Sequence, residues 1–336
     1  MTVGTAKNRP TSRQRFQDIF GRGHNLGNNI TASAANIQLV LYNTMLTSQI
    51  TLLVLLFLIS YVSAQTAVVF GGSGAVGSEV LKSVLSDDFF TEVIVVGRHS
   101  SSKKINDIVS SATSEVKVTN VNLARVEDIS TYADIERADA CLIALGVSSP
   151  HHENLQQWLS VEVDLIRTIA EFCNKIQVRS ISLLSAVDTE NESAVPFTKE
   201  EIASYGEESL GWIKMIMLYM RVKGLEEKAV IESAKDVQFI RLFQPNTIVT
   251  DQTRYGWFDA TLFRLHKLLD PILPAQYHSV HVRLLGAAMV ADATRKLQDK
   301  EGDVTQQDIA KLTYEDYVSV AGKAFQDSLE TKREEL

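Results

Sequence analysis

Short apolar runs alternate with amphipathic segments along most of the chain. The runs are rich in β-branched and aromatic residues and predict buried strands at Thr66–Phe70, Glu92–Val96, Val116–Val121, Ala138–Leu145, Ser180–Leu184 and Val237–Phe243. Between the strands, apolar residues recur at helical spacing, most clearly in 78–85, 155–172 and 210–231. Strands and helices in alternation predict an α/β protein with a doubly wound parallel sheet, covered on both faces and wound right-handedly.

The pattern changes after the last of these strands. Three further helices are expected, at Ala260–Leu269, Val282–Leu297 and Tyr314–Leu329. We therefore divide the chain into an extension over residues 1–65 and a domain over 66–336, whose additional elements begin at about residue 244. In such sheets the ligand crevice lies outside the carboxyl ends of the strands, so residues that follow a strand are the functional candidates.

Composition and charge narrow the class of protein. The chain has 336 residues, of which 45% are hydrophobic and 22% charged, as in a packed globular protein. The net charge is -8, although the first 24 residues hold five basic residues and one acid. The rest of the chain carries a net negative charge, which excludes a protein that binds nucleic acid through a positively charged surface. Cys141 and Cys173 lie in apolar patterns with no CxxC motif, so we expect two buried free thiols and neither a disulfide framework nor a zinc site.

The extension contains a long uncharged stretch, from Gly23 to Ser78. Within it, Met45–Ala64 approaches the length that spans a bilayer, and three interpretations compete. The first is a membrane anchor that follows a basic segment of the kind that organellar import machinery recognises. The second is a signal sequence, with translation starting at Met45 and cleavage after Val62-Ser63-Ala64. The third is a gene-model error over Gly23–Gln65. The anchor places the protein at a membrane, the mitochondrial outer membrane or that of the endoplasmic reticulum, and the cleaved signal favours the lumen of the endoplasmic reticulum. The third leaves it cytoplasmic.

A glycine-rich turn follows the first predicted strand. It runs Gly71-Gly72-Ser73-Gly74-Ala75-Val76-Gly77 and leads into a predicted helix. Glycines permit a tight turn and a close approach to a pyrophosphate, and the helix N-terminus offers free N–H groups and partial positive charge. Strand, glycine turn and helix together favour a dinucleotide site over a purely structural turn.

The end of the second predicted strand bears on the choice of cofactor. Arg98 follows it, about 20 residues past the glycines, where an acid binds the ribose of NAD and an arginine suits the 2'-phosphate of NADP. No carboxylate stands beside Arg98, so NADP(H) is preferred and NAD(H) remains possible. The alternative is an ordinary surface arginine.

Three residues have the chemistry for hydride transfer to a carbonyl. Ser185 ends the fifth predicted strand, while Tyr219 and Lys223 share one face of the following helix at i, i+4. A phenol can protonate the developing alkoxide, a nearby ammonium favours its ionised form, and a serine hydroxyl can hold the substrate oxygen. The alternative is a core tyrosine beside a solvated lysine.

These segments resemble a known family. The stretches Val69–Gly77, Val96–Arg98, Leu183–Ser185, Tyr219–Glu227 and Ile240–Pro245 resemble the short-chain dehydrogenase/reductases, especially the atypical branch of the Tat-interacting oxidoreductase and related fungal mitochondrial outer-membrane proteins. The resemblance covers about Thr66–Leu297. It implies an NADP(H)-binding Rossmann domain with a small C-terminal helical cap.

The resemblance also implies roles for individual residues. Tyr219 would be the acid/base, Lys223 would bind the nicotinamide ribose, and Ser185 would orient the substrate. Asn122 and Leu123 would flank the adenine. The glycine-rich turn would contribute Gly71, Ser73, Gly74, Ala75, Val76 and Gly77 to the cofactor site. The ends of the fourth and sixth predicted strands would contribute Ala144, Leu145, Gly146, Gln244 and Pro245.

Two departures from the family affect the expected site. An acidic insertion lies within Asp188–Glu208, which would be a substrate lid, displace the active site, or form a solvated loop. The segment 146–152, after the fourth predicted strand, lacks the Thr-Arg dipeptide that is usual in the family. Its adjacent His151 and His152 do not suit a shared metal site, while His278 and His281 are candidate substrate contacts.

Together these patterns predict an NADP(H)-dependent oxidoreductase that reduces a small-molecule carbonyl or oxidises an alcohol. The alternative is a non-catalytic NADP(H)-binding regulatory or membrane-tethered interaction protein. Neither the identity of the substrate nor the oligomeric state follows from the sequence, because specificity in this fold lies in variable loops.

Overall fold

The computed structural model of the protein describes residues 42–51, 65–146, 154–189, 194–205, 212–250, 269–299 and 306–322. The chain divides into two units, Met1–Ser63 and Ala64–Leu336. In the first unit, the described residues form a helix over 42–51 with exposed side chains. No helix within the described ranges is long and apolar enough to cross a bilayer. Most of the candidate anchor Met45–Ala64 lies outside those ranges, so the anchor stays a prediction.

The second unit is built on one seven-stranded sheet. Its strands stand in the order β3-β2-β1-β4-β5-β6-β9, and every neighbouring pair is parallel. The strand order reverses at β1, because β2 and β3 are added on one side of it and β4, β5 and β6 on the other, and this order confirms the doubly wound Rossmann topology expected from the sequence. The bounds are β1 Thr66–Phe70, β2 Glu92–Gly97, β3 Lys117–Asn122, β4 Ala140–Ile143, β5 Ser180–Leu184, β6 Phe239–Phe243 and β9 Asp308–Leu312.

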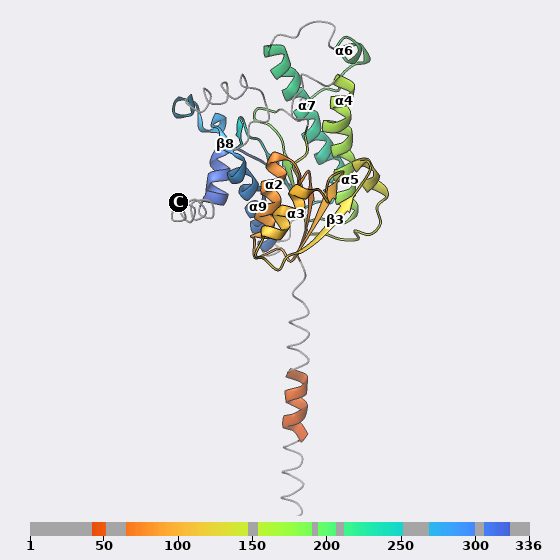
Figure 1. Cartoon of the computed structure of the whole chain (residues 1–336), viewed down its shortest axis with the longest axis vertical. Helices are drawn as coiled ribbons and strands as arrows, with labels where there is room; N and C mark the ends of the chain where they lie inside the picture. Colours follow the sequence, from red (N-terminus) through yellow and green to blue (C-terminus); the bar gives the residue numbers. More distant parts are fainter. Residues whose placement is uncertain are drawn as a thin grey trace, which may run out of the picture. The chain divides into compact units, whose positions relative to one another are not determined.

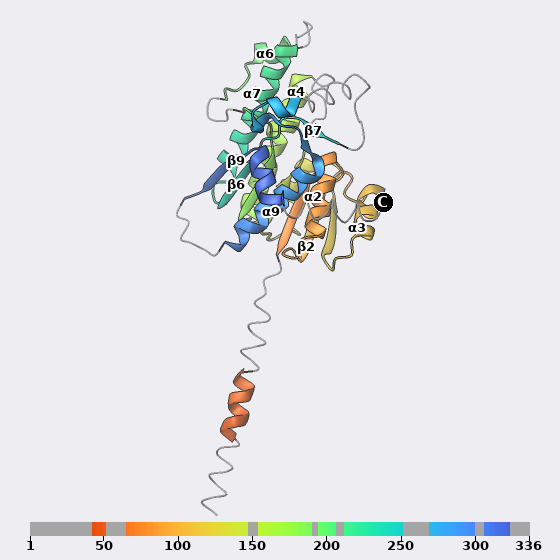
Figure 2. The same cartoon turned by 90° about the vertical axis from the view of Figure 1, so that its left-hand side faces the viewer.

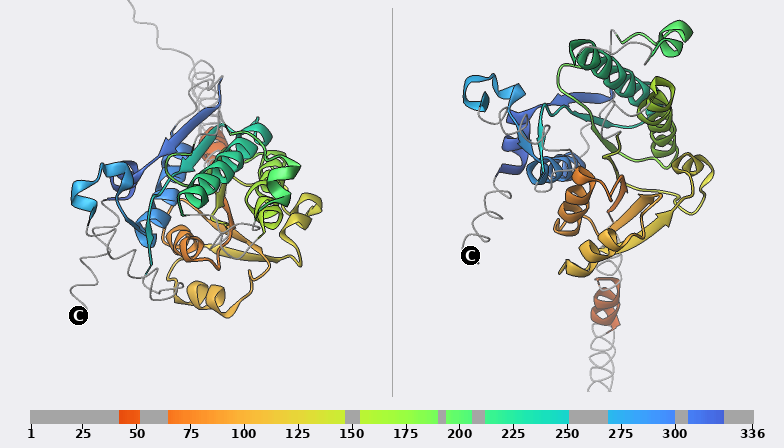
Figure 3. Two further views of the ribbon diagram at one scale, coloured as in Figure 1. Left: turned by 90° about the horizontal axis from the view of Figure 1, so that it is seen from above. Right: turned by 45° about the horizontal axis from the view of Figure 1, so that its top comes forward.

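Helices cover both faces of this sheet (Figure 1). Alternate residues of β1 point to opposite sides, so Val69 joins one apolar cluster and Val68 the other. The first cluster lies under α2 (Ala75–Leu85), α3 (Lys103–Ser111) and α9 (Val282–Gln298), which are grouped in Figure 2. The second lies under α5 (Ile166–Lys175), α7 (Trp212–Ser233) and the 3-10 helix η1 (Val126–Thr131), and Figure 3 shows α7 beside α5.

The helical segment predicted at 155–172 is continuous but changes its winding. It begins at α4 (Leu155–Leu159), where Asn154 Oδ1 accepts the Gln157 N–H at 2.7 Å. A π-helical turn, η2 (Ser160–Leu165), then connects α4 to α5. Such turns occur mostly as single insertions in α-helices, frequently at functional sites.

The C-terminal part differs from the prediction in its strands. The sequence indicated helices only, but β9 adds a seventh strand, and β7 (Ile248–Val249) pairs with β8 (Val280–His281). Two short 3-10 helices, η3 (Asp270–Ile272) and η4 (Ala275–Tyr277), precede β8. The predicted helix at Val282–Leu297 is α9, and the next one is described over 314–322. The predicted helix at Ala260–Leu269 lies almost wholly outside the described residues.

The expectation of two free thiols is wrong. Cys141 of β4 and Cys173 of α5 form a disulfide, with Cα atoms 6.5 Å apart and both side chains fully buried. Both residues belong to the cluster in which α5 packs on the sheet. Their spacing along the chain, without a CxxC motif, did not reveal this contact, because it depends on how the helix lies across the strand.

The C-terminal elements are held to the sheet by a buried ion cluster. Arg241 of β6 is 2% exposed, and its guanidinium contacts Asp292 of α9 and Asp308 at the start of β9. Asp292 also pairs with Arg295, at 2.6 Å. The cluster therefore fixes α9 and β9 against the strand that precedes the cap region.

Candidate cofactor and active site

The glycine-rich turn joins β1 to α2 and leaves the start of α2 open. Gly71 has a positive φ of 82°, which glycine adopts without strain, and its carbonyl accepts the Gly74 N–H at 2.8 Å. A Cβ at Gly77 would lie 2.6 Å from the Gly71 carbonyl carbon, so only glycine permits this close packing. Gly74 caps α2 without a side chain, and the first turn holds no acid. The amides of Ala75, Val76 and Gly77, at the start of this helix, are therefore suited to bind an anion.

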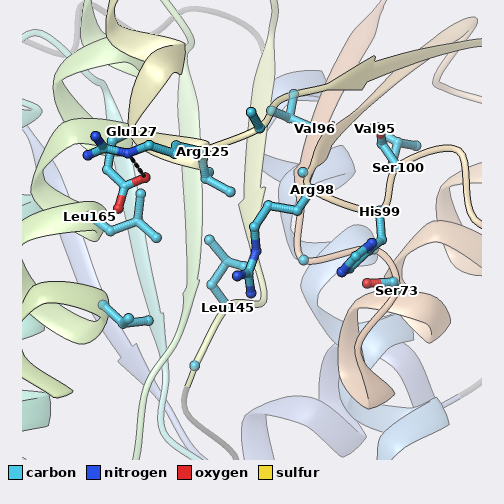
Figure 4. Close-up of a pocket in the computed structure, with 17 residues that line it drawn as sticks. Ser73, Val95, Val96, Arg98, His99, Ser100, Arg125, Glu127, Leu145 and Leu165 are labelled. Atoms are coloured by element: carbon cyan, nitrogen blue, oxygen red, sulfur yellow. Dashed lines mark ion pairs between the residues drawn. The ribbon is translucent and has the colours of Figure 1, made fainter. Parts of the chain in front are cut away.

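A pocket of about 320 Å³ extends from this turn along the carboxyl ends of the strands. The residues that line it lie at the end of β2, in the segments that follow β1, β2, β3 and β4, or on η1 and η2, and Figure 4 shows them. Predicted cofactor residues among them are Gly71, Ser73, Arg98, Leu145 and Gly146. The segment after β3 contributes Ala124, Arg125, Val126 and Glu127, which follow directly on the predicted Asn122 and Leu123.

The loop after β2 carries the groups that suit a phosphate. In Figure 4 the Arg98 side chain extends from this loop toward the side of the pocket that carries Leu145. Ser100 lines the same pocket, is 2% exposed, and its Oγ has no hydrogen-bond partner among the described residues. With its side-chain nitrogen assigned to the position that faces two carbonyl groups, Asn122 donates to Gly97 and Arg98 at 3.2 Å and 2.8 Å, and it does not line the pocket.

Lys223 stands beside the end of β4, fully surrounded by protein. A Cβ on Gly146 would lie 3.9 Å from Lys223 Nζ and 3.4 Å from Glu162 Oε1. The ammonium contacts Glu162 Oε2 at 2.7 Å and Glu226 Oε2 at 2.8 Å. Burial lowers the pKa of Lys223, but the two carboxyl groups outweigh burial and hold that pKa well above its ordinary value. Lys223 is therefore a cation in this structure.

Tyr219 lies one helical turn before Lys223. Its electrostatic interaction with Lys223 also contributes to the raised pKa of the ammonium. The phenol ring is half-buried and stacks on Trp158 of α4, with ring centroids 6.1 Å apart and planes inclined by 20°. The structure thus brings the predicted tyrosine and lysine together, and Trp158 fixes the orientation of the ring.

Ser185 takes part in a buried network. Its hydroxyl donates to Glu227 Oε1 at 2.5 Å, and the same oxygen accepts from Thr189 Oγ1 at 2.6 Å and Gln244 Nε2 at 2.8 Å. Gln244 is therefore turned toward this network, while the Pro245 carbonyl accepts the Val187 N–H at 3.1 Å. The network holds together the ends of β5 and β6.

Part of the acidic insertion packs against α7. Its helix α6 (Lys199–Ala203) begins with a capping box formed by Thr198 and Glu201. Arg221, two residues beyond Tyr219, donates to Glu201 at 2.8 Å and to the Val195 carbonyl at 2.8 Å. This part of the insertion therefore contacts α7, although no residue of α6 is buried.

Of the predicted histidines, two lie within the described residues. His278 Nε2 lies 2.9 Å from the Leu273 carbonyl, and His281 Nδ1 accepts the Arg283 N–H at 3.3 Å, at the start of α9. Both have structural contacts, so a substrate role stays a prediction. His151 and His152 fall outside the described residues, within which no cluster suited to a metal ion occurs.

Sequence reasoning missed the acids around Lys223. Glu226 and Glu227 follow it at i+3 and i+4 in the same helix, so helical spacing alone placed them near it. Glu162 falls on the apolar stripe formed by Leu155, Leu159 and Ile166. A charged residue on such a stripe is a signal of a buried partner.

Comparisons with known proteins agree with this geometry. The NAD(P)H-binding family matches residues 71–255, and no curated protein matches the chain. Among solved structures, a short-chain dehydrogenase/reductase variant from Serratia marcescens is 15% identical, with a TM-score of 0.50, over 74% of this chain and 96% of that one. A UDP-glucose-4-epimerase from Stenotrophomonas maltophila with bound NAD is 14% identical, with a TM-score of 0.50, over 74% and 78%.

Identities this low show the fold alone, whereas the family match covers more than half of the residues. The matched range begins at the first glycine of the turn and includes Arg98, Ser185, Tyr219 and Lys223. The chain therefore belongs to the NAD(P)H-binding family.

Proposed function

We propose that the protein is an NADP(H)-dependent oxidoreductase of the atypical short-chain type, which reduces a carbonyl or oxidises an alcohol. The observation that carries this proposal is the buried ammonium of Lys223, held beside Gly146 at the end of β4 and one turn from Tyr219. A cation at this place supports the ionised form of a phenol, which an acid/base catalyst needs.

The residues of the pocket fit the cofactor. The open start of α2 suits a pyrophosphate, and Arg98 with the unpartnered Ser100 Oγ suits the 2'-phosphate of NADP. Gly146 and Lys223 would hold the nicotinamide ribose. When bound, NADPH supplies the hydride.

Tyr219 then acts on the substrate oxygen. Its phenol O–H protonates the oxygen in reduction, and its phenolate removes the alcohol proton in oxidation, while Trp158 keeps the ring in place. Ser185 orients the substrate if its hydroxyl turns from Glu227 to the carbonyl oxygen. Glu227 would still accept from Thr189 and Gln244, so this rotation costs about one hydrogen bond, on the order of 1 kcal/mol.

The first experiment follows NADPH absorbance with a panel of aldehydes and ketones. We expect turnover that falls by about 100-fold or more in Tyr219→Phe, since general acid catalysis contributes about 10²–10⁴. Tyr132→Phe, at the end of η1 and not among the residues that line the pocket, is the matched control and should leave turnover unchanged. A wild-type rate equal to that of Tyr219→Phe would overturn the enzymatic role.

A second candidate function has one observation in its favour. The hydroxyl of Ser185 donates its hydrogen bond to Glu227 and not toward a substrate, as expected of a protein that binds NADP(H) without catalysing a reaction. Tight NADPH binding with no turnover on any carbonyl would support that function in place of the enzyme.

The choice of cofactor has its own test. Arg98→Leu removes the cation that extends into the pocket from the loop after β2, and a hydrogen bond to a charged group contributes about 1.5–3 kcal/mol. We therefore expect NADPH affinity to fall about 10- to 150-fold by fluorescence titration, with NADH affinity in the same variant nearly unchanged. Equal losses for both cofactors would refute the 2'-phosphate assignment.

A further inference from the structure

A lysine of α3 holds the glycine-rich turn from outside the cofactor pocket. Lys104 Nζ donates to the carbonyl oxygens of Ser73 and Gly74, at 3.0 Å in each case. The Lys104 side chain is exposed, and it is not among the residues that line the pocket. The ammonium therefore acts on the backbone of the turn and not directly on a ligand in the pocket.

The two carbonyl groups belong to peptide planes that shape the anion site. The Gly74 carbonyl shares its planar peptide group with the Ala75 N–H, the first amide of α2. The Ser73 carbonyl shares its peptide group with the Gly74 N–H, which donates to the Gly71 carbonyl at 2.8 Å. A bond to each carbonyl thus fixes the direction of the N–H in the same plane. A cation at the oxygen also polarises the peptide group, which makes its N–H a stronger donor.

The position of Lys104 is unfavourable for the helix that carries it. Lys103 and Lys104 lie in the first turn of α3, which holds no acid. A cation there is repelled by the partial positive charge of the helix N-terminus. An anion bound at the start of α2, next to the turn that Lys104 contacts, would offset this repulsion. The placement of the lysine therefore suits a bound phosphate better than it suits the stability of α3.

Lys104 also joins the turn to the loop that carries Arg98 and Ser100. This loop leads directly into α3, and the Ser102 N–H, at the N-cap of the helix, donates to the His99 carbonyl at 3.1 Å. The loop and the first turn of α3 are therefore one continuous hydrogen-bonded segment. Because Lys104 is the second residue of α3, its two bonds connect the loop suited to the 2'-phosphate with the turn suited to the pyrophosphate.

An apolar contact holds α3 in place without the ammonium. Ile105 is fully buried in the first cluster, and its Cδ1 lies 3.5 Å from the position that a Cβ would take on Gly72. This contact does not involve the Lys104 side chain. Replacing Lys104 should therefore leave α3 packed on the turn and remove only the polar link between them.

We propose that Lys104 is a positioning residue that couples the two phosphate sites of the cofactor. A 2'-phosphate bound by Arg98 and Ser100 restrains the loop and α3, and Lys104 passes this restraint to the peptide planes of the turn. The pyrophosphate of NADPH is then bound more tightly than the same group of NADH. This inference rests on the proposed function only for the place of the 2'-phosphate, and its test needs no turnover.

Lys104→Met keeps the length of the side chain and removes the ammonium. In fluorescence titrations, the Kd should rise about tenfold or more for NADPH and about threefold for NADH, so the preference for NADPH falls although Arg98 is intact. Lys104→Arg keeps the charge and the donors and should recover part of the loss. Lys103→Met is the matched control, because Lys103 is exposed in the same helical turn and makes no bond to the glycine turn among the described residues. It should leave both Kd values nearly unchanged.

A double-mutant cycle isolates the coupling from a general weakening of the turn. In an Arg98→Leu background the 2'-phosphate has lost its cation, so it no longer restrains the loop. Adding Lys104→Met to that background should raise the Kd for NADPH only about threefold, as it does for NADH in the wild-type background. Additive losses for NADPH in the two backgrounds would overturn the proposal.

Each remaining outcome also decides the matter. Equal losses of NADPH and NADH affinity in Lys104→Met would refute the coupling, and unchanged affinities would refute the positioning role altogether. Tm without cofactor should stay near that of the wild type, and if Lys104→Met does not fold, Lys104→Gln repeats the test. If the protein binds NADPH but reduces no carbonyl, the enzymatic role fails and the coupling stands. If Arg98→Leu weakens both cofactors equally, the place of the 2'-phosphate is refuted and the coupling with it.

Discussion

Replacing Gly77 by alanine tests the glycine turn as a cofactor site. A Cβ at this position would lie 2.6 Å from the Gly71 carbonyl carbon, closer still to its oxygen, and 3.1 Å from Gly72 N. Real Cβ contacts are at least 3.0 Å, and the atoms in the way are backbone. Because the Cβ would lie closest to the Gly71 carbonyl oxygen, the turn and α2 must separate by about 1 Å, which displaces the amides that face the pyrophosphate.

The expected magnitude has two parts. Overpacking a tight contact typically costs about 1–3 kcal/mol of unfolding free energy, which corresponds to a fall in Tm of roughly 2–10 °C for a domain of this size. Displaced amides weaken one or two hydrogen bonds to a charged group, each contributing about 1.5–3 kcal/mol. NADPH affinity should therefore fall by about tenfold or more.

Two assays separate these parts. Thermal unfolding gives Tm without cofactor, and fluorescence titration gives the Kd for NADPH at a temperature where both proteins are folded. Gly322→Ala is the matched control, because its nearest contact, Val318 Cγ1, lies at an ordinary 3.7 Å, and alanine in a helix costs nothing. A Gly77→Ala protein with wild-type Tm and wild-type affinity would refute the close-packing argument.

Two further predictions concern parts of the fold around the site. The Arg241 hydrogen bond lowers the pKa of Asp308 from 3.8 to about 2, so the stability it adds is present above about pH 4 and is lost as pH falls toward 2. That difference in pKa corresponds to at most about 2.5 kcal/mol of unfolding free energy. Because 40% of the Asp308 side chain is exposed to solvent, which screens the interaction, we expect about 1 kcal/mol. Urea unfolding of wild type and Asp308→Asn at about pH 6 and about pH 2.5 measures it, and equal losses in the two proteins would contradict it. Arg221→Lys removes the planar group that bonds Glu201 and the Val195 carbonyl together, so residues 194–205 should be cleaved about tenfold faster in limited proteolysis with Tm nearly unchanged. Unchanged cleavage would show that other contacts hold the segment.

The cofactor half of the fold was predictable because its signals are local. The strand Thr66–Phe70, the glycine turn and the apolar spacing after it are adjacent in sequence, and each restricts the backbone by itself. The strand β9 was not predictable in the same way. Its sequence, DIAKL, is short and half polar, and it becomes a strand because β6 offers an open edge for parallel pairing.

The chemistry of the site was only partly predictable for a related reason. The i, i+4 spacing placed Tyr219 and Lys223 on one face, and the structure agrees. Glu226 follows Lys223 at i+3, so helical spacing also placed it near the lysine. Glu162 and the partners of Ser185 come from other elements, so no spacing reveals those contacts, although Glu162 on an apolar stripe was a readable signal. The pairing of Cys141 with Cys173 depends in the same way on how α5 crosses β4.

The contact of the insertion with α7 has consequences for the tyrosine. A helix of five residues, such as α6, is not stable alone, so its position comes from Arg221 and from an apolar cluster to which Phe197 and Ile202 belong. Tyr219 and Trp158 belong to that same cluster. Contacts that hold the insertion in place therefore also pack the phenol ring, because one set of side chains does both. Undocking the insertion would remove neighbours from the ring that the proposed reaction requires to be fixed, so the insertion is coupled to the proposed active site through packing.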